Sequence, residues 1–370
     1  MHSLKGSFSR PETRRHTYWL KRLDNSLGPL LVKFCTTFFK KFSKSVFPPR
    51  EILIIRPGGI GDAVLLLPAL DVLHNYFSKT SIYILAERRN AGIFECIPYI
   101  RHVFLYDKNL ELYWAMKRDY DLVIDTEQWH HLSAVVAYLT RAPMRIGFST
   151  NERRGLFTHP VVYSHKDYEI FSFLSLLEPL VIKVKIDLER PFFPFINTKI
   201  RLDKDTTWVA IFPGASIKER RWPKERFKEI VKWLNKKGIK VVLIGGMEDK
   251  KLSDFIIEDN KLNLNLIGQL SLQQTASVLS QVKLLLTTDS GIMHLAIAVG
   301  TPVVALFGPG IEDKWAPRDK RSIVINKYLP CSPCTQFGYT LPCPYNARCM
   351  QEISANEAKE AIYEILAKAS

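Results

Sequence analysis

The chain has 370 residues, of which 46% are hydrophobic and 24% are charged, ordinary values for a globular protein. This length favours two domains, and no stretch reaches the roughly 18 consecutive uncharged apolar residues of a membrane-spanning helix, so we expect no integral membrane protein. The formal net charge is +15, and residues 1–50 hold eleven Lys/Arg against two acidic residues.

Residues 1–50 lack the compact apolar core and cleavage site of a signal peptide, so we expect a cytoplasmic protein that retains them. Apolar residues recur here every three or four positions, with basic residues largely between them, which predicts an amphipathic basic helix. The apolar positions are Trp19, Leu23, Leu27, Leu30, Phe34, Phe38 and Phe42, and the basic ones include Lys21, Arg22, Lys33, Lys40, Lys41 and Lys44. Such a helix lies on an anionic membrane or packs its stripe on the next domain, and both alternatives stay open.

Short apolar runs alternate with helical patterns through residues 51–178, which predicts a parallel α/β domain. The expected strands are 51–56, 81–87, 102–107, 120–127 and 144–148, and the expected helices are 62–77, 108–118 and 130–140. Residues 179–206 show no sustained period and are predicted to form a linker region.

The alternation starts again at residue 207 and predicts a second domain of the same class over 207–350, followed by a helical segment, 351–370. Strands are expected at 207–214, 240–246, 264–269, 283–289, 302–308 and 322–326, with helices at 223–237, 248–259, 271–281, 290–299 and 354–368. We therefore predict two doubly wound, Rossmann-like parallel-sheet domains facing a cleft. In such sheets ligands bind beyond the carboxyl ends of the strands, so the loops there are the place to look for function.

The first strand runs into "RPGGIGD", in which Gly58, Gly59 and Gly61 precede Asp62. A dinucleotide-binding turn would need a third glycine where Val64 stands, although Glu87 after the next strand is suitable for a ribose. Alternatively the glycines allow a tight turn, and Asp62 either caps the following helix or faces a cleft. No G-x-x-x-x-G-K-[ST] element is present, so a P-loop is excluded.

Two loops of the second half have the character of anion sites. The first offers small residues and cations between a strand and a helix: Gly214, Ala215, Ser216, Lys218, Arg220 and Arg221. Backbone N–H groups beside several cations favour anion binding, and a solvated basic loop is the alternative. The second loop begins a helix with Thr288, Asp289, Ser290, Gly291 and, one turn later, His294. Its N-terminus is suited to a diphosphate, while His294 taken alone is as compatible with a structural role.

Four of the six cysteines lie within 331–349, at Cys331, Cys334, Cys343 and Cys349, with the spacing C-x2-C-x8-C-x5-C. In a cytoplasmic protein this cluster favours a structural zinc or iron site over disulfides. The spacing is not that of a standard zinc finger, so local disulfides and unlinked thiols remain alternatives.

Three stretches together carry a family likeness: "ILIIRPGGIGDAVLLLPAL", "FPGAS…RRWPKERF" and "TTDSGIMHLAIAVGTPVVALFGP". In this order they resemble the ADP-heptose:lipopolysaccharide heptosyltransferases and their relatives in glycosyltransferase family 9, over about residues 51–350. The resemblance implies a GT-B fold with an acceptor-binding N-terminal and a nucleotide-sugar-binding C-terminal domain. It also implies that Asp62 is the catalytic base and that Asp289, Ser290, Gly291 and His294 line the donor pocket. Lys218, Arg220 or Arg221 would meet the diphosphate.

The function so implied is an inverting transfer of heptose from ADP-heptose to the inner core of lipopolysaccharide, with no cofactor or metal in catalysis. We expect a lipid-linked saccharide acceptor, peripheral contact with the cytoplasmic face of an anionic membrane, and no nucleic-acid partner. The alternatives are a family 9 enzyme for another nucleotide sugar or a protein acceptor, an NAD(P)-dependent oxidoreductase, and a non-catalytic sugar-nucleotide-binding protein. The oligomeric state is not predicted.

Overall fold

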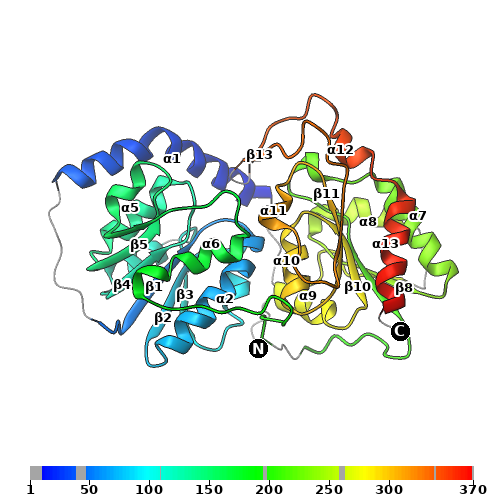
Figure 1. Ribbon diagram of the computed structural model, residues 1–370, viewed down its shortest axis with the longest axis horizontal. Helices are drawn as coiled ribbons and strands as arrows, with labels where there is room; N and C mark the ends of the chain where they lie inside the picture. Colours follow the sequence, from blue (N-terminus) through cyan, green and yellow to red (C-terminus); the bar gives the residue numbers. More distant parts are fainter. Residues whose placement is uncertain are drawn as a thin grey trace. The chain divides into compact units, whose positions relative to one another are not determined.

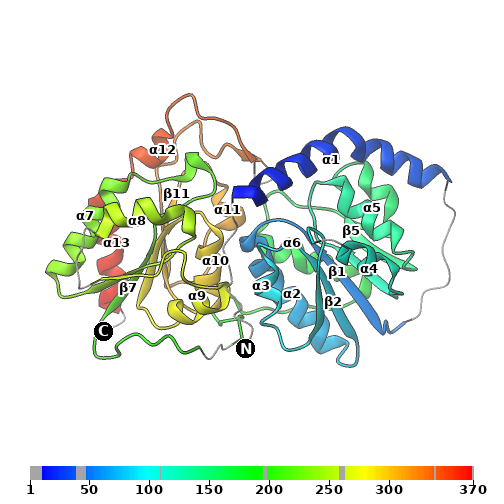
Figure 2. The same ribbon diagram turned by 180° about the vertical axis from the view of Figure 1, so that it is seen from behind.

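The structure is a computed structural model that describes residues 11–38, 47–108, 110–194, 198–257, 263–336 and 339–368. The chain separates into two compact units, the N-terminal unit (Ser9–Ile186) and the C-terminal unit (from Asp187). Each unit has a central sheet with helices on both faces (Figures 1 and 2). Lys40, Lys41, Phe42 and Lys44 of the predicted basic helix lie outside the described residues.

The sheet of the N-terminal unit is parallel, with the strand order β3-β2-β1-β4-β5-β6. Its strands are β1 (Glu51–Arg56), β2 (Ser81–Ala86), β3 (Ile100–Leu105), β4 (Leu122–Asp125), β5 (Met144–Phe148) and β6 (His159–Val161). Strand β1 is an almost continuous run of buried aliphatic residues because helices cover both of its faces. The chain winds outward from β1 in one direction and from β4 in the other, so the order reverses between these two neighbours.

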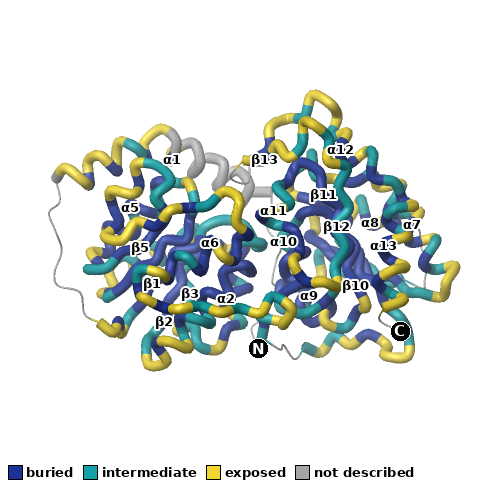
Figure 3. The backbone as a smooth tube through the Cα atoms, viewed as in Figure 1, coloured by how far each residue is buried: buried dark blue, intermediate teal, exposed yellow. Residues whose placement is uncertain are grey.

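Helices cover both faces of this sheet. They are α2 (Ile60–Tyr76), α3 (Ala91–Phe94), α4 (Glu111–Lys117), α5 (His131–Leu139) and α6 (Glu169–Ser175), with 3-10 turns η1 (Glu152–Leu156) and η2 (Glu178–Leu180). Leu53 and Ile55 of β1 belong to a cluster that includes Ala115 of α4 and Ala134 of α5. Helices α2 and α6 pack against each other. Figure 3 shows the strands buried at the centre of the unit.

The sheet of the C-terminal unit repeats this plan with the order β12-β11-β10-β7-β8-β9, again all parallel. Its strands are β7 (Trp208–Phe212), β8 (Lys240–Leu243), β9 (Leu264–Asn265), β10 (Leu284–Thr288), β11 (Val303–Phe307) and β12 (Ile323–Asn326). Here the order reverses between β7 and β10. A short hairpin, β13 (Thr335–Gln336) with β14 (Tyr339–Thr340), lies apart from this sheet.

The helices of the C-terminal unit divide between the two faces of its sheet (Figures 1 and 2). They are α7 (Lys224–Lys236), α8 (Lys250–Ile257), α9 (Leu272–Leu279), α10 (Gly291–Ala298), α11 (Glu312–Trp315), α12 (Arg348–Gln351) and α13 (Ala355–Lys368), with 3-10 turns η3 (Lys218–Arg220) and η4 (Met247–Asp249). The main core cluster joins Phe227 of α7, Ile256 of α8 and Ile362 of α13 to the central strands.

The predicted fold class is confirmed, because both units are doubly wound parallel sheets. The long apolar runs and the periodic helices fall where the sequence predicts them, within a few residues at each end. The elements without a sequence signal are short: α3, α6, α11, α12, β6 and the β13–β14 hairpin. They are too short to show a period and are held by the sheets on which they pack.

Helix α1 (Pro11–Phe38) packs on α5 and η1 through a face that the sequence pattern does not mark as apolar. Its buried residues are Asp24, Gly28, Val32 and Cys35, which are spaced three or four apart. A Cβ atom on Gly28 would lie 2.7 Å from the Cβ of His131, so only glycine lets the two helices approach this closely. The packed face is therefore not the predicted apolar stripe, since Leu23, Leu27 and Leu30 are exposed.

The Asp24 carboxylate caps helix α5 from outside that helix. It accepts hydrogen bonds from the backbone N–H groups of His131 (3.1 Å) and Leu132 (2.7 Å), and the Nδ1 atoms of His130 and His131 each lie 3.3 Å from it. Burial raises its pKa, but the hydrogen bonds from His130 and these amides outweigh burial and hold the pKa below its usual value. The charge of Asp24 thus fastens α1 to the unit.

In the described part of the chain, no helix is long and apolar enough to cross a membrane.

We predict that Asp24→Ala loosens α1, because the first amides of α5 lose the carboxylate that caps them. Hydrogen exchange at His131 and Leu132 should accelerate about tenfold at pH 7, equivalent to about 1.4 kcal/mol. Because the folded pKa is lowered, this advantage of the wild type is present above the unfolded pKa and disappears as the pH falls below about 4. Thr37→Ala, on an exposed position of the same helix, is the control. Equal exchange in both variants would contradict the cap.

Candidate functional site

The reversal of strand order creates one candidate site in each unit. In the N-terminal unit the loops after β1 and β4 leave neighbouring strands toward opposite faces, and in the C-terminal unit the loops after β7 and β10 do so. Diverging loops leave a crevice at the carboxyl ends of such strands, where ligands of doubly wound sheets bind. The motifs singled out in the sequence lie in three of these four loops.

Asp62 lies in the first turn of α2, directly after the loop that follows β1. Gly59 occupies the N-cap position, so Asp62 is the third residue of the helix rather than its cap. Gly58 has a φ angle of +102°, a conformation open to glycine and strained for other residues, and its carbonyl accepts a hydrogen bond from Arg89 Nε (2.9 Å). These glycines set the direction in which the chain enters α2, and with it the position of the Asp62 carboxylate.

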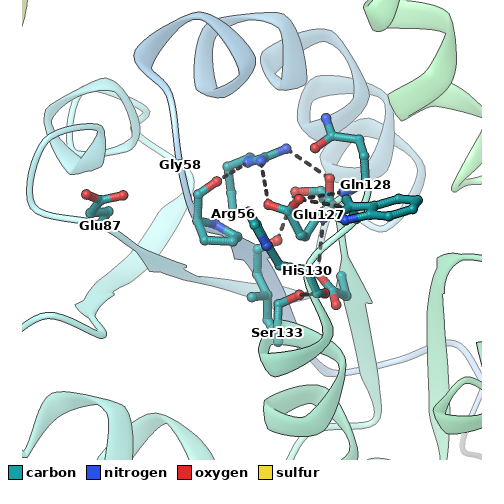
Figure 4. A network of polar contacts seen from close by, with 12 residues as sticks. Arg56, Gly58, Glu87, Glu127, Gln128, His130 and Ser133 are labelled. Atoms are coloured by element: carbon teal, nitrogen blue, oxygen red, sulfur yellow. Dashed lines mark hydrogen bonds and ion pairs between the residues drawn. The ribbon is translucent and has the colours of Figure 1, made fainter. Parts of the chain in front are cut away.

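Arg56, the last residue of β1, ties this loop to the end of β4 (Figure 4). Its guanidinium is buried and donates to the carbonyls of Pro57 (2.7 Å) and Thr126 (2.9 Å) and to the Glu127 carboxylate (3.3 Å). Burial raises the pKa of Glu127, but the charge of Arg56 is the larger influence among those that lower it, and the net pKa lies below the usual value. The ion pair therefore stays charged and holds the two diverging loops together.

Besides Glu127, another carboxylate belongs to the polar network near Asp62. Glu169 of α6 is buried and accepts hydrogen bonds from the Tyr163 hydroxyl (3.0 Å) and from Gln128 Nε2 (2.6 Å). Burial, then the charges of Glu169 and Asp62, raise the pKa of Tyr163 far above its usual value. Tyr163 thus remains a neutral donor between two acids. The sequence showed no sign of Tyr163, Glu169 or Glu127, because they come from separate segments.

The dinucleotide alternative loses its ribose-binding acid. Glu87 is buried and already engaged, with its carboxylate 3.0 Å from Arg89 Nε and accepting a hydrogen bond from the Tyr106 hydroxyl (2.9 Å). In Figure 4 it lies apart from the cluster of Arg56, Glu127 and Gln128. A ribose hydroxyl would have to compete with these partners, which weighs against a dinucleotide site at the turn after β1.

In the C-terminal unit, the structure separates the three cations of the loop after β7. Arg220 points inward, and its Nη1 lies 2.9 Å from the buried Asp289 carboxylate that follows β10. Arg221 is exposed and donates from Nε to the Ala215 carbonyl (3.3 Å), while Lys218 and Ser216 are exposed. Only Arg220 therefore bridges the diverging loops of this sheet.

Helix α10 begins at the same crevice. Ser290 is its N-cap and accepts from the Met293 backbone N–H (3.4 Å), so the N-terminal amides from Gly291 onward lie at the end of β10. One turn later His294 is buried, and burial together with the charge of Arg220 lowers its pKa to about 3. His294 is therefore neutral at physiological pH.

Several buried polar atoms at this crevice have no hydrogen-bond partner among the described residues. They are Arg220 Nε, Thr288 Oγ1 and His294 Nδ1, contributed by the loop after β7, the end of β10 and α10. A buried polar atom without a partner costs free energy, so native proteins keep few of them and they concentrate at functional sites. Their common position makes this crevice the candidate binding site for a polar ligand in the C-terminal unit.

Asp249 also belongs to this region, although the sequence did not single it out. It lies at the end of η4, and a Cβ atom on Gly214 would collide with its carboxylate. Likewise, a Cβ on Gly310 would collide with the Asp289 carboxylate. These two glycines allow the loops after β7 and β11 to approach acids that follow β8 and β10. The pair "GG" at 245–246, directly after β8, was the available signal for Asp249.

The four clustered cysteines do not form a metal site as placed. Cys331 and Cys334 are exposed, Cys343 is half-buried, Cys349 is buried, and all four are free thiols. Burial and the neighbouring thiols raise the pKa of Cys334, and burial raises the pKa of Cys349 to about 11. Among the described residues no three His, Cys, Asp or Glu side chains are arranged to hold a metal ion. The predicted zinc or iron is unsupported.

Residues 111–343 match the model of a family described as glycosyltransferase family 9 (heptosyltransferase). Lipopolysaccharide heptosyltransferase 2 of Escherichia coli (strain K12) is 26% identical to the chain over 213 residues, which cover 52% of the chain and 61% of that relative. The chain thus spans about three fifths of the length of this curated relative, and the counterpart from Salmonella typhimurium is matched over the same 61%.

Two solved structures share the architecture. A family 9 glycosyl transferase from Veillonella parvula has a TM-score of 0.73 and 20% identity, over 89% of this chain and 100% of that one. The ADP-heptose lipopolysaccharide heptosyltransferase II of E. coli has a TM-score of 0.70 and 22% identity, over 86% of this chain and 99% of that one. At such identities the likeness establishes the fold.

We predict that His294 makes the protein less stable in acid. Its pKa of about 3 in the folded state lies below the unfolded value of about 6.5, so the unfolded chain binds more protons and stability falls as the pH drops. Between pH 7.5 and 5 this residue should cost about 2 kcal/mol, which His294→Gln removes. Chemical denaturation of both proteins across this range measures the difference, and parallel stability curves would contradict a buried neutral imidazole.

Proposed function

Because this chain belongs to glycosyltransferase family 9, we propose that it transfers a sugar from a nucleoside-diphosphate donor to a saccharide hydroxyl. We propose ADP-heptose as the donor and the inner core of lipopolysaccharide as the acceptor, in agreement with the names of its relatives. The C-terminal unit binds the donor, and the N-terminal unit binds the acceptor and carries the catalytic base. Another nucleotide sugar or a protein acceptor is the alternative within the family.

One observation is the main support for the proposed donor site: Arg220, Thr288 and His294 present unpartnered buried polar atoms at the crevice between β7 and β10. A nucleoside diphosphate supplies phosphate oxygens for a guanidinium and for helix N-terminal amides, together with hydroxyl and ring atoms for Thr288 and the neutral His294. The Asp289 carboxylate, 2.9 Å from Arg220, holds this guanidinium in place without using its Nε atom. Arg220 is therefore the cation that we assign to the diphosphate.

The acceptor site centres on Asp62. Its carboxylate lies at the start of α2 with a neutral Tyr163 and the loop glycines beside it. As general base, Asp62 accepts the proton of the acceptor hydroxyl while that oxygen forms a bond to the anomeric carbon. The bond from the anomeric carbon to the diphosphate oxygen breaks in the same step, so the configuration inverts. The diphosphate leaves with the electron pair of the broken bond and gains one negative charge, which Arg220 and the N-terminus of α10 stabilise.

This step needs no cofactor, because the protein supplies both the base and the positive charge for the leaving group. We accordingly propose metal-independent catalysis and give the cysteine cluster no part in the reaction. The acceptor that we propose is lipid-linked, so the protein works in peripheral contact with the cytoplasmic face of an anionic membrane. The engaged Glu87 weighs against the oxidoreductase alternative, and a non-catalytic protein would bind the donor without turnover.

We predict that Asp62→Asn lowers the transfer rate about 10²–10⁴-fold, the usual contribution of a general base. The fold and the dissociation constant for ADP should not change, because Asp62 belongs to the N-terminal unit. Asp71→Asn is the matched control, since it changes an acid on the same helix that is hydrogen-bonded to Tyr99. Rates are measured by release of ADP. Near-normal turnover in Asp62→Asn would remove this residue from the base role.

We predict that neighbouring arginines differ in their effect on donor binding. Arg220→Gln should raise the dissociation constant for ADP about 10–100-fold, because a charge-assisted hydrogen bond to the diphosphate is lost. Arg221→Gln should change it less than about threefold, since this side chain is exposed and bonded to a backbone carbonyl. Isothermal titration calorimetry with ADP measures both, and circular dichroism verifies that both variants fold. Equal losses would overturn the assignment of Arg220.

A further inference from the structure

Helix α1 presents two different faces. Asp24, Gly28, Val32 and Cys35 face the N-terminal unit, where they pack on α5 and η1. Four leucines lie elsewhere on the helix and remain accessible, with exposed fractions of 44% for Leu23, 47% for Leu27, 63% for Leu30 and 37% for Leu31. We call these four residues the leucine stripe. Contiguous exposed apolar side chains of this kind on a soluble unit indicate an interaction surface.

The charge around the leucine stripe is positive. Residues 21–46 contain six Lys/Arg and a single acid, Asp24. Asp24 is buried against α5, where its charge is occupied by backbone amides and imidazoles. The one acid of the segment therefore does not face outward, whereas Lys33 is exposed on α1. An apolar stripe in a segment whose sequence has a net positive charge complements a lipid bilayer, in which apolar chains lie beneath anionic headgroups.

From these observations we infer that the leucine stripe of α1 docks on an anionic lipid bilayer, with the helix lying in the plane of the membrane interface. This inference deepens the proposed function, on which it rests for the lipid-linked acceptor. The leucines enter the boundary of the acyl chains, and the exposed Lys33 contacts lipid phosphates. Because an adjacent face of α1 is packed on α5, the helix orients the N-terminal unit on the membrane rather than tethering it loosely.

A second copy of the chain fits the stripe less well than a bilayer does. In a two-fold symmetric contact, each stripe would face its equivalent, and the two positively charged segments would be brought together. Like charges at a contact weaken association, and no exposed acid lies in residues 21–46 to offset them. Anionic lipid supplies the missing opposite charge.

The test is co-sedimentation of the full chain with vesicles of phosphatidylcholine, alone or with 30 mol% phosphatidylglycerol. Each measurement is repeated over about a tenfold range of salt concentration. Leu27→Gln/Leu30→Gln removes the centre of the stripe while leaving the packed face intact. The matched control is Leu110→Gln/Leu341→Gln, which changes leucines that are 64% and 65% exposed outside α1.

We expect the wild type and the control to bind the anionic vesicles at least tenfold more tightly than the neutral ones. The stripe variant should bind the anionic vesicles at least tenfold more weakly than the wild type does. Circular dichroism and transfer to a delipidated, soluble acceptor should be the same for all three proteins. Unchanged vesicle binding by the stripe variant would overturn the inference, as would wild-type protein that ignores anionic vesicles.

Light scattering without lipid tests the competing occupant: a wild-type dimer that the stripe variant dissociates would also overturn the inference. Failure of the proposed function gives a different result. Protein without transferase activity would still bind vesicles through the stripe, whereas failure of the inference alone would leave transfer to the soluble acceptor intact.

Discussion

The reversal of strand order at the centre of each sheet is the constraint on which the rest of the structure depends. At each reversal two loops leave neighbouring strands in opposite directions, and a buried arginine–carboxylate pair joins them: Arg56 with Glu127, and Arg220 with Asp289. A buried charge without its partner is expensive, so each pair holds its loops in a defined arrangement. The candidate site residues lie directly beside these two pairs.

The two ion pairs differ in whether every donor atom of the arginine has a hydrogen-bond partner. The donors of Arg56 reach two carbonyls and a carboxylate, and this makes the loop before Asp62 a rigid support. Arg220 keeps an unpartnered Nε, next to a neutral His294 and the start of α10. One crevice thus has the properties needed to position a base, and the other those needed to receive an anion. Such a division suits a reaction that joins two substrates.

Asp24 has a comparable role outside the sheets. By capping α5 it satisfies backbone amides and also removes the only acid of residues 21–46 from the surface. Gly28 allows the close approach that this contact requires. The same packing therefore leaves the leucines exposed and the local charge positive.

The sequence by itself determined the fold class, most elements and the motif positions, because apolar runs, helical periods and glycine-rich turns are local properties of the chain. It also identified Asp62, Asp289, Ser290 and His294 as candidates. Only the tertiary structure decided which of Lys218, Arg220 and Arg221 turns inward, since that depends on Asp289, a residue distant in sequence. It likewise decided which face of α1 packs, because the contact depends on Asp24 and Gly28 meeting α5 rather than on hydrophobic periodicity. Glu127 and Glu169 emerged for the same reason: pairing between distant segments leaves no local pattern to read.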